Sequence, residues 1–228
     1  MFFRRRSTQA EYFDLPNRQE SETIAAFRDL DRLNPAFRFE LPFQMTLPRW
    51  LGPARCERLE LLDLGAGTGL LGKRLSEWAS RREWCWRFTN LDTNPLALKL
   101  GNAPRSITGS ALALPFADGS FDVVIASQMT HHLTDEEVVL HLREAWRVTR
   151  DALFICDLHR NAGLYVMLWL STRLMRICPP VREDALISVK RGFRLRELRS
   201  LAAKAQLTNP KVWLYYLSRV VLQARKGD

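Results

Sequence analysis

Residues 58–69, RLELLDLGAGTG, place an apolar run directly before three closely spaced glycines. The run that ends at Leu64 has the length and residue types of a buried strand. Gly65, Gly67 and Gly69 allow the backbone to turn tightly and to approach a ligand, and a helix that follows exposes free amides in its first turn. A strand, a glycine turn and a helix N-terminus in this order are typical of a nucleotide-binding site.

Outward from this stretch, short apolar runs alternate with segments of helical periodicity. The predicted strands are 58–64, 86–91, 106–108, 121–127 and 152–157, and the predicted helices between them are 69–80, 94–100 and a helix that the Thr134–Glu137 capping box begins and that ends near Val148. This alternation predicts an α/β fold with a Rossmann-like, doubly wound, mostly parallel sheet.

The last two predicted strands, 212–217 and 219–224, bring the sheet to seven strands, of which the last is antiparallel. Ser218 alone separates these two strands in the sequence. Because one residue is too short for an ordinary hairpin, we do not expect them to pair with each other.

Helical segments flank the alternating core within what we expect to be a single domain. Residues 1–57 are predicted to form an N-terminal helical cap, with helices at 21–33, capped by Ser21, and at 42–50. Residues 58–228 are predicted to form the main α/β domain. Within that domain residues 160–192 form an apolar helical cover, with a helix at 162–177 that Pro179 and Pro180 end, and a further helix occupies 195–205.

Composition narrows the class of protein. Hydrophobic residues make up 46% and charged residues 26% of the chain, as in ordinary globular proteins. Residues 7–20 are polar and supply no signal sequence, so we expect a cytoplasmic protein. The net charge of +9 permits contact with nucleic acid or an anionic membrane, but the basic residues are scattered. The four cysteines lack metal-ligand spacing, so no metal site is predicted.

The acidic residue and glycines of Asp63, Gly65, Gly67 and Gly69 resemble the first motif of class I S-adenosylmethionine (SAM) methyltransferases. Residues 109–124, GSALALPFADGSFDVV, are similar to a second stretch of that family. The resemblance extends from about Leu61 to Asp157. It implies SAM as the cofactor and methyl transfer to a small-molecule acceptor.

The resemblance also implies which residues bind the cofactor. The glycine turn would cradle the amino-acid end of SAM, the acid that ends the second strand would bind the ribose hydroxyls, and the residues after Gly109 would meet the adenine. Ser110 stands where the family has Asp, which leaves the Ala111 amide for this contact. The full set is Asp63, Gly65, Ala66, Gly67, Gly69, Asp92, Thr93, Ser110, Ala111, Ser127 and Gln128.

Three histidines follow predicted strands at the edge where ligands of such sheets bind. His131 and His132 come after the fourth strand and His159 after the fifth. A positioned base helps when the acceptor is a phenol or an amine, so these three are candidate catalytic residues.

The acceptor class rests on two observations. The N-terminal E-Y-F-D-L-P and the D-L-H-R after the fifth predicted strand resemble bacterial methyltransferases of polyketide or quinone biosynthesis. The apolar helix at 162–177, with Trp169 among its large side chains, is expected to wall a pocket for an apolar or aromatic, phenolic or quinone-like acceptor. The same helix would also suit peripheral contact with a membrane surface.

Two other functions stay open. Gly67, Gly69 and Gly72, with Asp92 twenty residues later, also spell the fingerprint of an NAD(P)-dependent oxidoreductase. A nucleic-acid methyltransferase is compatible with the charge, but the sequence has neither the Asn-Pro-Pro-Tyr tetrad of a base-flipping enzyme nor an added RNA-binding module. The oligomeric state is unreadable from the sequence.

Overall fold

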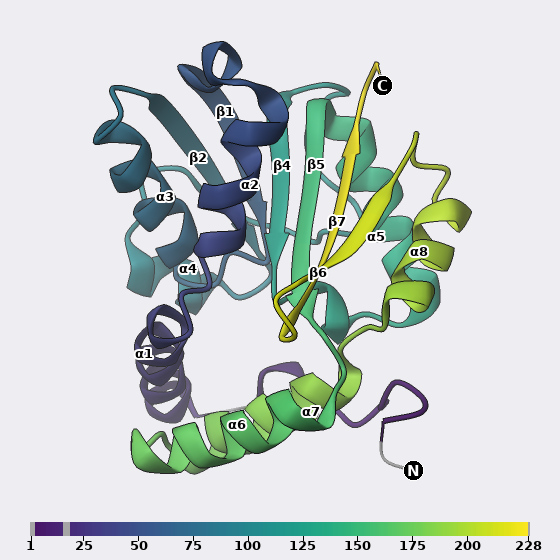
Figure 1. The fold of residues 1–228 in the computed structure, drawn as a ribbon. Helices are drawn as coiled ribbons and strands as arrows, with labels where there is room; N and C mark the ends of the chain where they lie inside the picture. Colours follow the sequence, from purple (N-terminus) through teal and green to yellow (C-terminus); the bar gives the residue numbers. More distant parts are fainter. Residues whose placement is uncertain (1–2, 16–18, 228) are drawn as a thin grey trace.

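A computed structural model describes residues 3–15 and 19–227. Its centre is a seven-stranded sheet in the order β3-β2-β1-β4-β5-β7-β6, with helices on both faces (Figure 1). Neighbouring strands pair in parallel except β7, which is antiparallel to β5 and β6. The predicted doubly wound sheet with an antiparallel last strand is therefore confirmed. The strands are β1 (Arg58–Leu64), β2 (Cys85–Asp92), β3 (Ser106–Thr108), β4 (Phe121–Ser127), β5 (Thr149–Leu158), β6 (Lys211–Tyr215) and β7 (Arg219–Arg225).

Two apolar layers sandwich the sheet, because successive side chains of a strand point to opposite faces. Leu61 of β1 packs with the helices of one face, and Leu62 and Leu64 pack with those of the other. The first face carries α2 (Leu41–Leu51) and α3 (Leu70–Ser80), and the second carries α5 (Asp135–Val148) and α8 (Leu195–Lys204).

The remaining helices are α1 (Glu20–Ala36), α4 (Pro95–Gly101), α6 (Ala162–Leu174) and α7 (Pro179–Arg191). Figure 1 shows α1, α6 and α7 beyond the end of the sheet at which β5 leads into α6, which is the carboxyl end of the parallel strands. In such folds this end holds the ligand. No helix within residues 3–15 and 19–227 is long and apolar enough to cross a membrane.

The N-terminal cap of α1 differs from the prediction. The helix begins at Glu20 with Gln19 as its N-cap, so Ser21 lies inside the first turn and does not cap it. Glu20 and Glu22 in this turn stabilise the positive end of the helix dipole, which explains why the helix extends beyond the serine.

Pro179 and Pro180 do more than end a helix. The chain leaves α6 at Leu174, before the predicted end, and the two prolines form the first turn of α7, which the sequence analysis missed. Proline is tolerated there because the first amides of a helix have no intrahelical partner.

The expectation that the last two strands would not pair was wrong. β6 ends at Tyr215, two residues earlier than predicted, so Tyr216, Leu217 and Ser218 form the connection. Tyr215 pairs with Arg219 across an antiparallel hairpin. Tyr216 takes a positive φ of 46°, which supplies the turn that a one-residue link could not make.

Candidate active site

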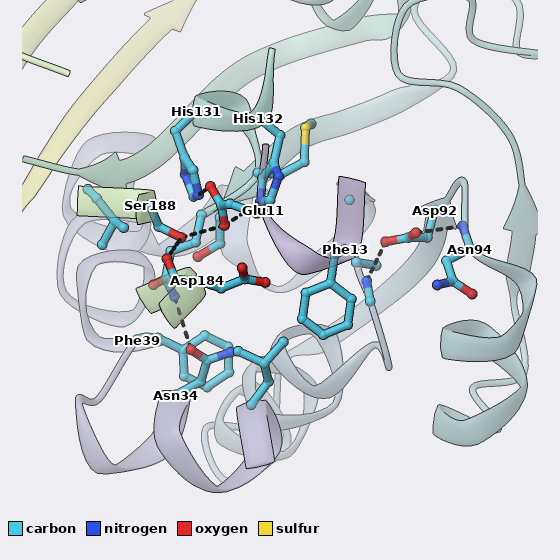
Figure 2. A pocket seen from close by; sticks show the side chains of 18 of the residues that line it. Glu11, Phe13, Asn34, Phe39, Asp92, Asn94, His131, His132, Asp184 and Ser188 are labelled. Atoms are coloured by element: carbon cyan, nitrogen blue, oxygen red, sulfur yellow. Dashed lines mark hydrogen bonds and ion pairs between the residues drawn. The ribbon is translucent and has the colours of Figure 1, made fainter. Parts of the chain in front are cut away.

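A cavity of about 1010 Å³ lies at the carboxyl ends of the strands. Its wall contains the glycine turn, residues after β2 and β4, the N-terminal segment, and side chains of α1, α6 and α7 (Figure 2). Every cofactor residue proposed from the sequence except Gly69 lines this cavity: Asp63, Gly65, Ala66, Gly67, Asp92, Thr93, Ser110, Ala111, Ser127 and Gln128.

The glycine turn adopts left-handed backbone angles, which favour glycine. Gly65 and Gly67 have φ values of +66° and +56°, and a Cβ on Gly65 would lie 2.2 Å from Cγ of Met129. The amides of Gly65 and Ala66 both donate to the carbonyl of Leu91, at 2.8 and 3.1 Å. These two hydrogen bonds fix the turn to β2. Gly69 lies outside the cavity wall and is the N-cap of α3, with a left-handed backbone conformation.

Asp92 holds the turn from the opposite side. Its Oδ2 accepts the Gly67 amide at 2.7 Å and its Oδ1 accepts the Asn94 amide at 2.8 Å. Each carboxylate oxygen has a second lone pair, so the side chain can also accept two hydroxyl donors of a vicinal diol.

Helix α1 closes the cavity over the cofactor end, a contact that the sequence analysis missed. The Thr68 hydroxyl donates to Asp31 of α1 at 2.8 Å, and the Gln128 amide donates to Asn34 at 3.4 Å. Nothing in the periodicity of α1 distinguishes Asp31 from its other acidic residues, since the contact joins residues far apart in the chain.

Asp63 lies buried beneath the turn. Burial, and then the charge of Asp92, raise the pKa of its carboxyl to about 8. Within the part of the chain that the structure describes, its Oδ2 has no hydrogen-bond partner. A buried acceptor beside a glycine turn fits a ligand that carries an ammonium group and a positive sulfonium, as SAM does, because a nearby cation favours the carboxylate.

Replacing Asp63 with Asn should stabilise the cofactor-free protein at alkaline pH. The folded-state pKa lies above the ordinary value of 3.8. Ionisation therefore destabilises the folded state above that value, and the full penalty is reached as the pH passes about 8. We expect the melting temperature of Asp63→Asn to exceed that of the wild type at pH 9 by more than at pH 5. A difference that does not grow with pH would contradict this interpretation.

Ser110 lines the cavity, and its side chain stabilises the backbone turn that it begins. The Ser110 hydroxyl accepts the Leu112 amide at 3.1 Å. This bond shapes the segment that carries Ala111, the position expected to meet the adenine.

His131 and His132 lie together in a 3-10 turn after β4, Thr130–His132. The buried His131 places Nδ1 2.6 Å from Oδ1 of Asp157, the carboxylate at the end of β5, and its backbone amide donates to Oδ2 at 3.0 Å. His132 places Nδ1 2.8 Å from Oδ1 of Asp14.

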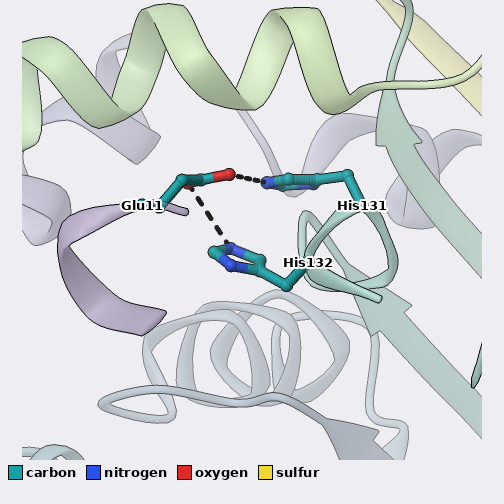
Figure 3. Close-up of side chains that lie close together, drawn as sticks. All are labelled: Glu11, His131 and His132. Carbon is teal, nitrogen blue, oxygen red and sulfur yellow. Dashed lines mark ion pairs between the residues drawn. The ribbon is translucent and has the colours of Figure 1, made fainter. Parts of the chain in front are cut away.

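Glu11 of the N-terminal segment faces both imidazole rings (Figure 3). Its Oε1 lies 3.6 Å from Nε2 of His131, and its Oε2 lies 3.7 Å from Nε2 of His132. Burial raises the pKa of Glu11 to about 7, against the lowering effects of His132, Ser188 and Arg191. We call Glu11, His131 and His132 the polar cluster.

Arg191 of α7 fastens the N-terminal segment to this turn. Its guanidinium donates to the carbonyls of His131 (3.0 Å) and His132, to the carbonyl of Gln9 (3.0 Å), and to the carboxylate of Asp14. Glu11, Asp14 and Arg191 were not among the predicted site residues, although the first two belong to the E-Y-F-D-L-P stretch.

His159 does not join the other two histidines. Its Nδ1 lies 3.1 Å from the Leu217 carbonyl, and the Asn161 amide donates to the His159 carbonyl at 3.0 Å. The residue does not line the cavity. The structure therefore places it among the contacts that join β5 to the β6–β7 turn.

Aromatic and aliphatic side chains wall the rest of the cavity. They come from the N-terminal segment, α1, the short segment that follows α1, and α6: Phe13, Phe27, Phe37, Phe39, Leu164, Met167 and Leu168. Figure 2 shows Phe13 between Asp92 and the polar cluster. Trp169, expected in this wall, is instead 43% exposed with Arg173 stacked on its ring at 4.3 Å.

Comparisons with known proteins agree with this fold. Residues 62–155 match the family model described as "Methyltransferase domain". A demethylmenaquinone methyltransferase of Mycolicibacterium paratuberculosis is 29% identical over 133 residues, which cover 58% of this chain. The match spans only 54% of that relative's length.

Two solved structures share the fold. One is a putative SAM-dependent methyltransferase of Methanococcus maripaludis, with a TM-score of 0.65 and 14% identity, covering 94% of this chain and 97% of the other. The second is a Burkholderia thailandensis 1,6-didemethyltoxoflavin N1-methyltransferase with bound 1,6-didemethyltoxoflavin and S-adenosylhomocysteine, with a TM-score of 0.57 and 18% identity, covering 94% and 93%.

The methyltransferase model matches the glycine turn and the strands β1 to β5, and the observed sheet order places both beside one ligand-sized cavity. Residues 62–155 are therefore similar to a methyltransferase domain, and the chain has the fold of class I SAM-dependent methyltransferases.

Proposed function

We propose that the protein transfers the methyl group of SAM to a small acceptor that has an apolar or aromatic body and an ionisable, phenolic or quinol-like hydroxyl. One observation carries this proposal. A single cavity joins the glycine turn and Asp92 to an aromatic wall and to the polar cluster, so cofactor and acceptor can meet without crossing solvent.

Each end of the cavity has a separate task in this proposal. Asp63, the glycine turn and Asp92 would hold SAM, and Ser110 and Ala111 would border its adenine. The aromatic wall would align the acceptor so that its oxygen or carbon approaches the methyl carbon in line with the sulfur. Forming that bond breaks the bond from sulfur to methyl, the electron pair stays on sulfur, and S-adenosylhomocysteine leaves.

The proton of the acceptor hydroxyl must go to a nearby group. His131 and His132 lie at the acceptor end, and Asp157 orients His131 through its Nδ1. An oriented imidazole nitrogen can accept such a proton. His159 has no part in this step because it lies outside the cavity wall.

The acceptor class also draws on the comparison with known proteins. The mycobacterial relative methylates demethylmenaquinone by its name, and the apolar fused ring of a naphthoquinol suits the aromatic and aliphatic wall described above. We therefore propose a hydroquinone or phenol as the first acceptor to test.

The experiment is to incubate the purified protein with SAM and either a short-chain demethylated naphthoquinol, simple phenols or a mixed RNA. We expect S-adenosylhomocysteine and a product heavier by one methylene with the naphthoquinol or a phenol. Methylation of the RNA but of neither small molecule would refute the proposed acceptor class and favour a nucleic-acid acceptor. Binding of NADH but not of S-adenosylhomocysteine in calorimetry would refute methyl transfer altogether.

The outer face of α6 supports a proposed contact with an anionic membrane surface. Leu164 and Leu168 of α6 line the cavity, but its opposite face exposes Val166, Trp169, Leu170 and Leu174 by 43% to 74%. The exposed Arg173 and Arg176 flank these side chains. Large apolar side chains with arginines beside them are typical of helices that lie in a membrane interface, where a lipophilic acceptor would be found.

Replacing Leu170 with Glu should weaken binding to vesicles of phosphatidylglycerol by about tenfold or more, because burying one leucine contributes roughly 1.5–3 kcal/mol. The measurement is co-sedimentation, with phosphatidylcholine vesicles to separate charge from apolar contact. Leu140→Glu on α5 is the matched control, since Leu140 is exposed to a similar extent, 48% against 50%. Equal losses in both variants, or no binding by the wild type, would refute the membrane contact.

A further inference from the structure

The polar cluster has the composition and spacing of a metal site. The two distances from Glu11 to the imidazole nitrogens, 3.6 and 3.7 Å, exceed the length of a hydrogen bond. Two ligands that bind one zinc ion at about 2.0–2.1 Å in tetrahedral geometry lie roughly 3.4 Å apart. The three groups therefore stand too far apart to bond to one another and about as far apart as ligands of one ion.

Each histidine is held by its other ring nitrogen. Nδ1 of His131 meets Asp157 at 2.6 Å, and Nδ1 of His132 meets Asp14 at 2.8 Å. A histidine that binds a metal usually donates its second N–H to a carboxylate, which fixes the ring and leaves the free nitrogen a lone pair for the ion. Both histidines show this arrangement, and both free nitrogens point to the same carboxylate.

Buried polar atoms without hydrogen-bond partners lie at the place where the ion would bind. Among the residues that the structure describes, Nε2 of His131 and Oε1 of Glu11 are buried without a hydrogen-bond partner, and both side chains are 2% exposed. The second oxygen of Glu11 accepts the Ser188 hydroxyl at 2.6 Å. Leaving such buried atoms unpaired destabilises the folded protein, and an ion at this point would offset that cost.

The charge around the cluster also favours a cation. Four carboxylates, those of Glu11, Asp14, Asp157 and Asp184, lie in or against it. Two guanidinium groups lie near them, since Arg191 contacts Glu11 and Asp14 and the buried Arg219 lies near Asp157, so the carboxylates outnumber the arginines. Arg191 approaches Oε1 of Glu11 to 3.5 Å but directs hydrogen bonds to backbone carbonyls and Asp14.

We propose that Glu11, His131 and His132 bind one divalent transition-metal ion, such as Zn²⁺, at the acceptor end of the cavity. Two histidines and one carboxylate leave coordination positions open, as in catalytic zinc sites. All three residues line the cavity, so an acceptor oxygen can reach an open position. The role of the ion in catalysis, although not its binding, rests on the proposed function.

In that role the ion would bind the acceptor hydroxyl and lower its pKa, so that the oxygen reacts as its anion. With the ion bound, His131 and His132 would hold it and would not themselves accept the proton as proposed above. The released proton would pass to a water molecule, and the acceptor oxygen would then take the methyl group as the bond from sulfur to methyl breaks. Glu11 and its N-terminal segment would thereby belong to the reaction chemistry as well as to the wall of the cavity.

The test is direct binding of the metal alone. The purified protein of 228 residues is treated with a chelator, and Co²⁺ or Zn²⁺ is then titrated, with detection by visible absorption for Co²⁺ and by calorimetry for Zn²⁺. We expect one ion per chain and, for Co²⁺, an absorption band of a site with nitrogen and oxygen ligands. His132→Gln should weaken binding by about a hundredfold or more, since it removes a ligand.

Asp14→Asn removes no ligand but removes the carboxylate that orients His132, so it should weaken binding by about 10–100-fold. His159→Gln is the matched control, since His159 lies outside the cluster, and it should leave binding unchanged. Binding of S-adenosylhomocysteine to each variant shows that it is folded and tests the cofactor site separately. Absence of a bound ion, or equal affinity in His132→Gln and His159→Gln, would overturn the site.

Discussion

Replacing Asp92 with Ala should weaken the binding of S-adenosylhomocysteine by at least about a hundredfold. The Asp92 carboxylate accepts the amides of Gly67 and Asn94 and faces the cavity. Hydrogen bonds to a charged group contribute about 1.5–3 kcal/mol each, so the loss of the two proposed ribose contacts and of the Gly67 anchor together exceeds the 2.7 kcal/mol that a hundredfold change requires. Isothermal titration of the purified variant measures this loss.

Asp118→Asn is a suitable control for the change of charge, because Asp118 lies on the surface and pairs with Arg147. It should bind S-adenosylhomocysteine as the wild type does. If Asp92→Ala binds within a factor of three of the wild type, the cofactor does not meet the end of β2, and the assignment of the turn to SAM fails.

Replacing Asp157 with Asn should lower the free energy of unfolding by about 3 kcal/mol, because breaking a buried charged network by changing one partner typically costs that much. Asp157 is fully buried and accepts three N–H groups, from the His131 ring, the His131 backbone and Leu158. An asparagine NH₂ would face one of these donors, and the buried Arg219 nearby would lose a neighbouring negative charge.

For a chain of this length such a loss lowers the melting temperature by about 6–12 °C. Asp122→Asn provides the comparison, since Asp122 forms a partly exposed ion pair with Arg150 at 2.6 Å. Exposed pairs contribute about 0–1 kcal/mol, so this variant should melt close to the wild type. Similar melting temperatures for both variants would show that Asp157 is not a structural anchor of the histidine turn.

The sheet and the cofactor end could be predicted because their signals are local. The run from Leu61 to Gly69 contains a strand, its turn and the start of a helix within one short stretch, and the Thr134–Glu137 capping box is present as predicted. The residues proposed to bind SAM follow strands whose order the parallel topology dictates. Once β1, β2 and β4 are neighbours, their carboxyl ends must meet.

The acceptor end could not be predicted in the same way, because its contacts join distant parts of the chain. Glu11 accepts a hydrogen bond from Ser188, and Arg191 donates to Asp14 and to the backbone of the two histidines. These residues are far apart in the sequence, and the position of α7 brings them together. That helix is short of apolar periodicity and starts with two prolines, which the sequence analysis took as a terminator. Because α7 was not predicted, neither Arg191 nor Ser188 could be placed at the site. The burial of Glu11, which depends on contacts with both, could therefore not be predicted either.

The bond between Thr68 and Asp31 limits how this protein could be redesigned. The proposed acceptor wall comes from segments outside the sheet, so exchanging the N-terminal segment and α6 for those of a known methyltransferase is an obvious route to new substrates. Helix α1, however, also carries the partner of the glycine turn. A chimera that replaces α1 without an acidic residue at position 31 would alter cofactor binding together with substrate choice, so graft boundaries should fall on either side of this helix.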